Sequence, residues 1–425
     1  MKRKKTIPWN IFIAIIGAMF FGTLVGNQAT VSGVSIYSII DTVGTLFLNA
    51  LTLVVIPLVS ASIITGISRI GNEVGFKRIG AKIFMFYLGT SLLAILVGLL
   101  FVNLFAPGVG QDISNIAASS SLIQIQENVG KTGSNIAGLL LSVIPNNIFY
   151  AISQGNMLGI IFFSLIFGYC ISKIESQAGT TLQHFFQGVF QATLQMTRII
   201  MKFLPYGVFC LVSKVFMNTG ISSLSSVALF FLTVVVGLMV FMLVCLPLLL
   251  HFIGKVNSFR HLKAMAPALI TAFSTSSSSA TLPITIDCAE KRAGVSNRIC
   301  SLVIPLGTSV NMSGSALYEC VAAMFVAQCY GIELSFSTQF VIVFMALITS
   351  IGIAGIPSAS LVAVLIILKA VGLPPEGIGL FIAVDRILDM CRTTVNVFSD
   401  SCCAVLVAKS EGETKVLTKE PVDIV

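Results

Sequence analysis

Long apolar segments separated by polar links fill the first half of the chain. They lie near residues 9–30, 43–69, 80–106, 137–173, 187–219 and 225–253, with a long polar loop over 107–134. A helix of about 20 apolar residues crosses a bilayer, so most of these segments predict membrane spans. Prolines, glycines and asparagines interrupt the fourth segment at 145–147 and 155–156, which predicts a crossing in pieces. The amphipathic start of the fifth, from Gln183 to Arg198, predicts a helix partly outside the hydrocarbon.

From about Phe259 the apolar runs become short and are interrupted by polar residues, glycines and prolines. Residues 261–274 and 282–289 flank a serine-rich stretch, and 340–370 repeat this design around a Gly/Pro/Ser stretch at 350–360. Each arm of about 12–15 residues spans about 20 Å as a helix, whereas a full crossing needs about 30 Å. The pattern therefore predicts two re-entrant helical hairpins. Between them, the segment 304–328 is broken at 311–315.

The last apolar segment carries a stripe of polar and charged side chains. On a helix, one face about 100° wide would hold the following residues: Asp385, Asp389, Arg392, Thr393, Asn396 and Asp400. A bare charge in mid-membrane costs at least about 2.5–3.5 kcal/mol, so this face must line a protein interior or a wet cavity. Asp389 and Arg392 are one turn apart and could simply neutralise each other, but two further acids and an amide would remain. The stripe favours a site for a solute and ions.

Composition and charge support a membrane protein that is not an enzyme. Hydrophobic residues make up 56% of the chain and charged residues 10%, where soluble domains carry roughly 25% charged residues; the mean hydropathy is +0.98. Four basic residues at positions 2–5 precede the first apolar run, which predicts a retained span with a cytoplasmic N-terminus. The net charge of +8 therefore indicates orientation and not nucleic-acid binding. The cysteines and histidines show no metal spacing, and no catalytic triad or phosphate loop is present.

Four motifs together resemble the glutamate transporter family, the dicarboxylate/amino acid:cation symporters. They are SSSSATLP at 276–283, NMSGSALYE at 311–319, GIPSAS at 355–360 and the polar stripe at 385–400. The resemblance covers nearly the whole chain. It implies an all-α integral membrane protein with eight transmembrane helices plus two re-entrant hairpins, working as an elevator-type transporter. It also implies a homotrimer in the cell membrane (inner or plasma), in contact with membrane lipid and with both termini cytoplasmic.

The resemblance further implies a division of the chain into domains. Residues 1–258 would be mainly scaffold and trimerisation helices, with the segments near 80–106 and 225–253 joining the transport domain. Residues 259–409 would be the transport core, containing the two hairpins, the broken helix and the final polar helix. Residues 410–425 would be a cytoplasmic tail.

By motif position, the resemblance implies that Arg392 binds the side-chain carboxylate of an acidic amino acid and Asp389 its ammonium. The main chain around Ser278 and the side chain of Asn396 would hold the α-carboxylate. The other implied pocket residues are Ser277, Ser315, Gly355, Ile356, Ser360 and Thr393. Independently of the family, the charges balance, since two carboxylates and one ammonium meet one Arg, one Asp and helix-end N–H groups. The planar fork of Arg also suits a carboxylate better than Lys would.

The coupling ions that the resemblance implies are Na⁺ and H⁺. Three Na⁺ sites of the family are matched by residues of this chain. The first consists of Gly307, Asn311, Asn396 and Asp400, and the second of Ser309, Ser350, Ile351 and Ile353. The third consists of Tyr87, Thr90, Ser91 and Asn311. At the third, this chain has Ser313 where the family pattern has an Asp, which argues against three-sodium coupling. Glu319 stands where proton-coupled relatives carry a Glu, and burial disfavours the charged form of a carboxyl. Glu319 is therefore either a proton carrier or a neutral structural acid.

Together these features predict a secondary active symporter for glutamate or aspartate, coupled to Na⁺ and/or H⁺. A C4-dicarboxylate or neutral amino acid symporter of the same family is the alternative. By resemblance, neutral-substrate relatives lack the Arg and dicarboxylate relatives lack the ammonium-binding Asp, whereas this chain keeps Arg392 and Asp389. A channel is a further hypothesis, but a pocket closed by two hairpin tips is suited to occlusion. A receptor role has no soluble signalling domain in the chain to support it.

Overall fold

The protein is almost entirely helical. A computed structural model describes residues 9–26, 29–31, 34–70, 76–110, 144–154, 156–219, 223–352, 359–414 and 416–418. Within these ranges, strands occur as one short antiparallel pair, β1 (Thr30–Val31) and β2 (Val34–Ser35). Four helical stretches there are long and apolar enough to cross a membrane, or five if a bent pair counts as one span. The predicted all-α class is confirmed at this level.

The first helices are α1 (Trp9–Val25), α2 (Ile36–Leu53), α3 (Val55–Ile70) and α4 (Phe76–Phe105). The apolar segment predicted over 43–69 lies within one candidate membrane span, Ile36–Ser68, in which a single turn residue, Val54, separates α2 from α3. Pro57 lies in the first turn of α3 and has no N–H to donate to the carbonyl of Leu53. The carbonyl of Leu53 therefore lacks its helical hydrogen bond from position 57, next to the interruption at Val54.

The fourth predicted segment is broken, as expected, into α7 (Ile148–Ser153) and α8 (Met157–Ile171). Asparagine side chains start both helices. Asn147 accepts hydrogen bonds from the N–H groups of Phe149 and Tyr150, and Asn156 accepts one from Gly159. These caps satisfy N–H groups that the first helical turn leaves without partners. Most of the predicted loop over 107–134 and residue 155 lie outside the described residues.

The amphipathic fifth segment forms α9 (Gln177–Met201), followed at a 57° bend by α10 (Leu204–Thr219). The break falls at residues 202–203, and Pro205 is accommodated in the first turn of α10. The sixth segment forms α11 (Ser223–Val240), which continues through the π-helical turn η2 (Phe241–Cys245) into α12 (Leu246–Phe252).

The first predicted hairpin consists of α13 (Ser258–Thr275) and α14 (Ser278–Asp287), followed by the π-helical turn η3 (Cys288–Arg292). Its tip is shorter than the predicted serine-rich stretch. Ser276 ends α13 with a left-handed backbone (φ 49°), and the hydroxyl of Ser277 accepts a hydrogen bond from the N–H of Ala280. Ser278 therefore lies in the first turn of α14 and not in a loop, since N-cap geometry draws the chain into the helix.

The broken helix consists of α15 (Asn297–Val310) and α16 (Ser313–Cys329), so the break is confined to Asn311 and Met312. The second hairpin has the arms α17 (Phe336–Gly352) and α18 (Ala359–Val371); its tip, 353–358, lies outside the described residues. A 3₁₀ turn, η4 (Pro375–Leu380), leads into α19 (Ile382–Ser410), the predicted polar helix.

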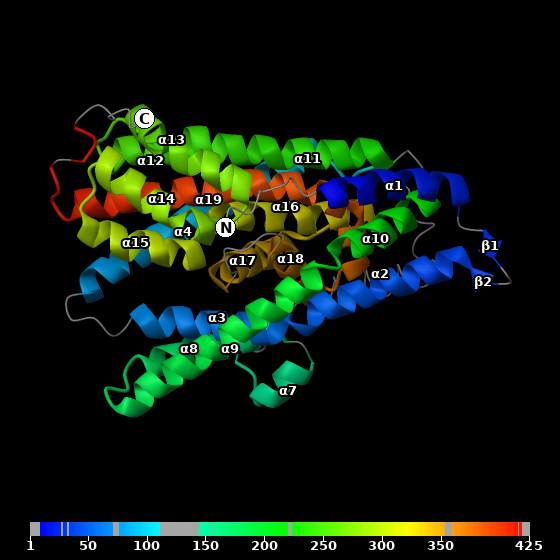
Figure 1. Ribbon diagram of the computed structural model, residues 1–425, viewed down its shortest axis with the longest axis horizontal. Coiled ribbons are helices and arrows are strands. Elements are labelled where there is room, and N and C mark those ends of the chain that lie inside the picture. The colour runs from blue at the N-terminus through cyan, green and yellow to red at the C-terminus, as the bar shows by residue number, and fades with distance from the viewer. Residues whose placement is uncertain are drawn as a thin grey trace, which may run out of the picture.

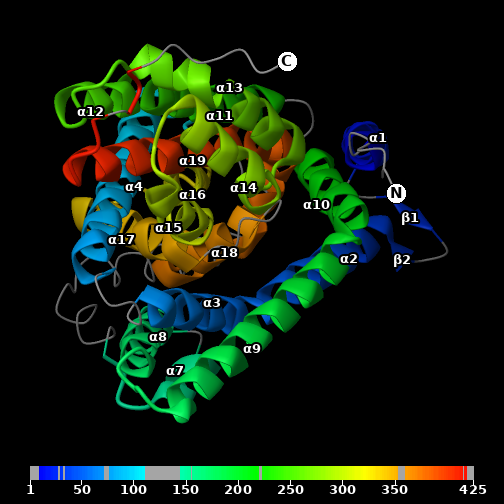
Figure 2. The same cartoon turned by 60° about the vertical axis from the view of Figure 1, so that its left-hand side comes forward.

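The helices fall into two groups (Figures 1 and 2). One group is a compact bundle of α4 and α11 to α19, in which α16 packs on α4 and α13 on α19. The other group contains α1, α2, α3, α7, α8, α9 and α10, and runs along one side of the bundle as a long arm. In this arrangement, α4 and α11 from the earlier part of the chain pack against helices of its last third, such as α16 and α19.

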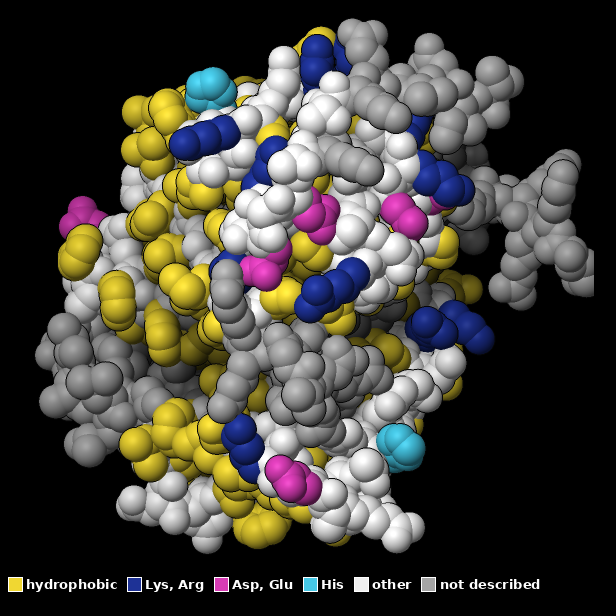
Figure 3. All heavy atoms as spheres, turned by 90° about the vertical axis from the view of Figure 1, so that its left-hand side faces the viewer, with side chains coloured by type: hydrophobic (Ala, Val, Ile, Leu, Met, Phe, Trp, Pro, Cys, Tyr) yellow, Lys and Arg dark blue, Asp and Glu magenta, His cyan; other side chains and the backbone are white. Residues whose placement is uncertain are grey.

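The chain after α19 packs against the bundle. The amine of Lys82 on α4 donates to the carbonyl of Ser410 at 3.1 Å and forms an ion pair with Glu411. The carboxylate of Glu413 accepts a hydrogen bond from the N–H of Ser296 at 3.0 Å, at the start of α15. Figure 3 shows that Lys, Arg, Asp and Glu side chains gather at this end of the molecule. The described part of the expected tail is therefore attached to the bundle.

Candidate functional site

The guanidinium of Arg392 is the buried centre of the polar stripe on α19. Its side chain is 0% exposed, and Nη2 donates to Oδ1 of Asp385 at 3.0 Å and to Oδ1 of Asp389 at 3.1 Å. The ring of Tyr318 on α16 covers one face, with its centroid 3.8 Å from Cζ. Among the described residues, Nε and Nη1 have no hydrogen-bond partner. Arg392 therefore pairs with Asp389, as expected if the two simply neutralised each other. Its two remaining donor atoms can still bind a planar anion.

Asp389 is contacted by two arginines. Besides its Oδ1 contact with Arg392, its Oδ2 accepts from Nη1 of Arg386 at 3.4 Å. Sequence reasoning missed Arg386, although its position three residues before Asp389 on a helix was a readable signal. The hydroxyl of Thr393 donates to the carbonyl of Asp389 at 2.8 Å, so this predicted pocket residue also lies beside the acid.

Asn396 joins the stripe to the start of α16. Its Oδ1 accepts from the N–H of Gly314 at 2.8 Å, and its Nδ2 lies 3.3 Å from Oγ of Ser315 and 3.3 Å from the sulfur of Met312. A Cβ at position 314 would lie 2.9 Å from the carbonyl oxygen of Arg392, so glycine permits this approach. The break in α15–α16 therefore faces the stripe through Asn396, which brings Ser315 into the same site.

A second cluster surrounds Asn311 at the break. Its Nδ2 donates to Oδ1 of Asp400 at 2.9 Å and to the hydroxyl of Ser399 at 3.1 Å. Its Oδ1 accepts from the hydroxyl of Thr90 at 3.2 Å and from that of Ser91 at 3.5 Å. The second oxygen of Asp400 is buried and has no hydrogen-bond partner among the described residues. A buried carboxylate oxygen requires a partner. The cluster also holds three hydroxyl oxygens and the amide oxygen of Asn311, and oxygen groups of this kind suit a hard cation.

Three predicted Na⁺ ligands from α4 belong to this cluster or lie next to it. Thr90 and Ser91 contact Asn311 directly, and the hydroxyl of Tyr87 donates to the carbonyl of Val303 on α15 at 2.5 Å. Ser313 is fully buried, and its hydroxyl has no partner in the described part of the chain. The first and third predicted ligand sets therefore meet at Asn311.

The remaining predicted residues lie at the ends of the hairpin arms or outside the described structure. Ser277 and Ser278 form the start of α14, Ser309 is in the last turn of α15, and Ser350 and Ile351 are near the end of α17. The hydroxyl of Ser350 donates to the carbonyl of Leu347 at 2.8 Å. Ser360 is 2% exposed in the first turn of α18. Ile353, Gly355 and Ile356 lie outside the described residues.

Gly307→Ala tests the cation cluster. A Cβ at position 307 would lie 2.5 Å from Oδ1 of Asp400 and 2.6 Å from its Cγ, so the carboxylate must move. Overpacking of this kind costs about 1–3 kcal/mol, and we expect the Na⁺ concentration for half-maximal substrate binding to rise roughly tenfold or more. Gly89→Ala on α4, where nothing lies within 4 Å, is the matched control. An unchanged Na⁺ dependence in the Gly307 variant would remove Asp400 from the cation site.

Glu319 contacts the second hairpin. It is 0% exposed on α16, and its Oε2 lies 2.7 Å from the hydroxyl of Thr349 on α17. That hydroxyl is also 2.8 Å from the carbonyl of Met345. The single hydroxyl proton of Thr349 can be donated to only one of these two acceptors at a time. If it goes to Met345, a proton on the Glu319 carboxyl can be donated to the hydroxyl oxygen, and both hydrogen bonds are then formed. The geometry suits a protonated carboxyl, and the role as proton carrier stays a prediction.

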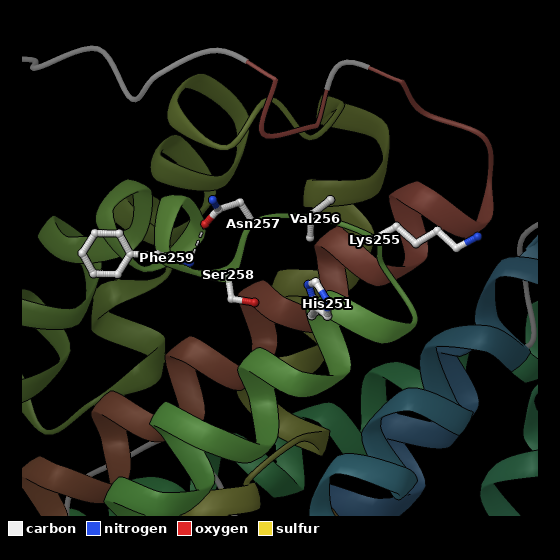
Figure 4. A pocket seen from close by; sticks show the side chains of 6 residues that line it. All are labelled: His251, Lys255, Val256, Asn257, Ser258 and Phe259. Carbon is white, nitrogen blue, oxygen red and sulfur yellow. Dashed lines mark hydrogen bonds between the residues drawn. The ribbon is translucent and has the colours of Figure 1, made fainter.

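A hollow of about 660 Å³ lies away from these groups, at the connection between α12 and α13 (Figure 4). His251 and residues 255–259 line it. Asn257 uses its side chain to cap α13, accepting from the N–H of Phe259 at 3.0 Å, and Lys255 points away from the other side chains. No residue of the stripe or of the Asn311 cluster lines this hollow, so it has no part in the site.

Comparison with known proteins finds one family over nearly the whole chain. The sequence profile of the "Sodium:dicarboxylate symporter family" matches residues 8–410. The "Proton/sodium-glutamate symport protein" of Bacillus caldotenax is 36% identical over 415 residues, covering 97% of this chain and 96% of that protein. The "Proton/glutamate-aspartate symporter" of Escherichia coli (strain K12) is 33% identical over 96% of this chain and 93% of its own length. "Excitatory amino acid transporter 3" of Homo sapiens is 34% identical, over 86% of this chain and 78% of its own.

Proposed function

This chain belongs to the sodium:dicarboxylate symporter family, and we propose that it takes up glutamate or aspartate by secondary active symport with Na⁺ and H⁺. The observation that carries this proposal is the buried guanidinium of Arg392, whose Nε and Nη1 have no partner among the described residues and lie beside the carboxylate of Asp389. An acidic amino acid offers a carboxylate for the first group and an ammonium for the second. Two of the relatives named above, from Bacillus caldotenax and Escherichia coli, are named as symporters of glutamate or of glutamate and aspartate, which supports the same substrate class.

In the proposed complex, Arg392 binds the side-chain carboxylate and Asp389 the ammonium. The α-carboxylate lies between Asn396 and the main chain of Ser277 and Ser278. The start of α14 supports this placement, because the first N–H groups of a helix and its dipole attract an anion. Ser315 and Thr393 complete the pocket on the side of the broken helix and α19, and Gly355, Ile356 and Ser360 complete it on the side of the second hairpin.

Asp389→Ala tests whether Asp389 binds the ammonium of the substrate. If Asp389 binds it, we expect the variant to lose affinity for aspartate and glutamate far more than for succinate or malate, which have no amino group. Competition against a radiolabelled ligand measures all four. Asp385→Ala is the matched control, because Asp385 also contacts Arg392 and is expected to affect the four ligands alike. Equal weakening by Asp389→Ala would indicate only a structural pairing with Arg392.

Na⁺ would be held by Asp400, Asn311 and Gly307, supported by the buried second oxygen of Asp400, with a second ion at the end of α17. Bound cations would neutralise Asp400 and draw the hairpins together around the substrate. Because Ser313 supplies no carboxylate, we propose fewer than three Na⁺ per cycle and a proton carried by Glu319. The hydrogen bonding between Glu319 and Thr349 supports this assignment.

We further propose the family architecture for this chain, with eight transmembrane helices, two re-entrant hairpins and an elevator movement. The compact bundle of α4 and α11 to α19 would be the transport domain, and the long arm would be the scaffold of a homotrimer (Figure 2). Both termini would be cytoplasmic in the cell membrane. The charged end in Figure 3, where the chain after α19 is attached, supports this orientation.

Uptake into proteoliposomes, with Na⁺ and pH gradients imposed separately, tests the proposal as a whole. We expect saturable uptake of aspartate or glutamate that responds to both gradients. Uptake of succinate without either amino acid would identify a dicarboxylate carrier. Ion flux that needs no solute would identify a channel.

A further inference from the structure

Arg386 lies at the edge of the proposed substrate pocket and has no role so far. Its Nη1 donates to Oδ2 of Asp389 at 3.4 Å, while Oδ1 of the same carboxylate accepts from Arg392 at 3.1 Å. The two guanidinium groups therefore contact different oxygens. Their environments differ as well, because the side chain of Arg392 is 0% exposed and that of Arg386 is 17% exposed. One of the two cations of Asp389 is fixed, and the other has access to solvent.

The contacts of the two arginines explain this difference. Arg392 is held by Asp385 as well as by Asp389, and the ring of Tyr318 covers it. For Arg386, in contrast, the hydrogen bond and ion pair within the described part of the chain are those to Asp389, and its Nε has no partner there. A long, partly exposed side chain with one weak contact can leave it at little cost.

We propose that Arg386 takes the place of the substrate's ammonium at Asp389, and thereby sets the selectivity between acidic amino acids and dicarboxylates. This inference rests on the proposed function, because it assumes that Asp389 binds the ammonium. An amino acid displaces Arg386 from Oδ2, and the guanidinium turns to solvent. A dicarboxylate brings no cation, so Arg386 stays on Asp389 and neutralises it beside the bound anion.

The charges of the stripe support this role. Asp385 and Asp389 face Arg386 and Arg392, two acids against two bases. Without Arg386, the carboxylate of Asp389 would have one arginine contact instead of two, next to a ligand that carries two negative charges. An amino acid replaces the missing cation with its own ammonium, whereas succinate cannot. Removing Arg386 should therefore change the two affinities in opposite directions.

Arg386→Gln in the purified full-length protein, titrated with L-aspartate and with succinate in Na⁺, is the test. We expect aspartate to bind about two- to fivefold more tightly and succinate about two- to fivefold more weakly, which is the range for a partly exposed ion pair. Arg386→Lys keeps the charge and should recover part of the lost succinate affinity. Lys263→Gln removes a positive charge from the exposed start of α13 and controls for net charge.

A general attraction of anions by Arg386 would give a different result, because its loss would weaken aspartate as well as succinate. Weakening of both ligands, or no change in either, overturns the proposal. In an Asp389→Ala background, Arg386→Gln should leave both affinities unchanged, and an undiminished effect there also overturns it. The proposed function is tested separately by the parent chain: if the parent binds neither aspartate nor glutamate, that function fails, whatever the variants do.

Discussion

Arg392→Cys is expected to abolish uptake of aspartate and glutamate and to leave a residual affinity for small neutral amino acids. The substitution removes the only guanidinium that is both fully buried in the described structure and provided with unpaired donors. A substrate carboxylate would then be buried without a partner, which costs about 3–5 kcal/mol, or roughly two to three and a half decades of affinity. A neutral side chain such as that of serine does not need this partner.

Radiolabelled uptake of aspartate and serine in the variant measures the effect. Arg392→Lys is an informative companion, because it keeps a charge but loses the planar fork and should recover only part of the aspartate affinity. Serine uptake that persists in the Cys variant shows that the protein still folds, even though Asp385 and Asp389 lose their shared cation. An aspartate affinity equal to that of the parent would show that Arg392 does not bind the side-chain carboxylate of the substrate.

Glu319→Gln is expected to separate substrate exchange from proton-coupled uptake. Glutamine resembles the protonated carboxyl in shape and charge, and its amide can donate to the hydroxyl of Thr349 as the protonated carboxyl would. Exchange of internal for external substrate should therefore survive. Net uptake should lose its response to an imposed pH gradient, because no group on α16 would then load and release the proton.

Both activities are measured in the same proteoliposomes, as counterflow for exchange and as gradient-driven accumulation for net uptake. Thr349→Val is a matched variant, since it removes the hydroxyl contact but leaves the carboxyl in place. It should keep a response to pH. If net uptake by the Glu319 variant still follows the pH gradient like the parent, Glu319 is not the proton carrier. The absence of a carboxylate at Ser313 would then need another explanation.

Much of the fold was predictable because the bilayer restricts what a backbone can do. The turn at Ser276 and the break at Asn311 were visible in the sequence, because polar residues interrupt the apolar runs there, but α13 has 18 residues and α17 has 17, which is longer than the arms of about 12–15 residues that the sequence predicted. Boundaries were less predictable. The restart of the helix at Val54 depends on one proline, and the serines after Ser277 lie in a helix because the Ser277 hydroxyl caps it.

The stripe on α19 was predictable for the same reason, since helical periodicity alone places Asp389, Arg392 and Asn396 on one face. Its partners were not visible in this periodicity. The contact of Asn396 with Gly314 joins residues 82 positions apart, and the contact of Asn311 with Asp400, 89 positions apart, was expected only from the family resemblance. Nothing in local sequence specifies such a distance, because packing of the whole bundle determines it.

The amino-acid sequence by itself therefore determined the helical membrane class, the hairpins, the broken helix and the charged face of α19. All of these follow from short-range periodicity and from the cost of exposing polar groups to lipid. Within the described residues, only the tertiary structure decided which donors of Arg392 have no partner, that Arg386 shares Asp389, and that Ser399 joins the cluster around Asn311. Those relations depend on distances of a few ångströms between side chains of different turns and helices, which arise only when the bundle is packed.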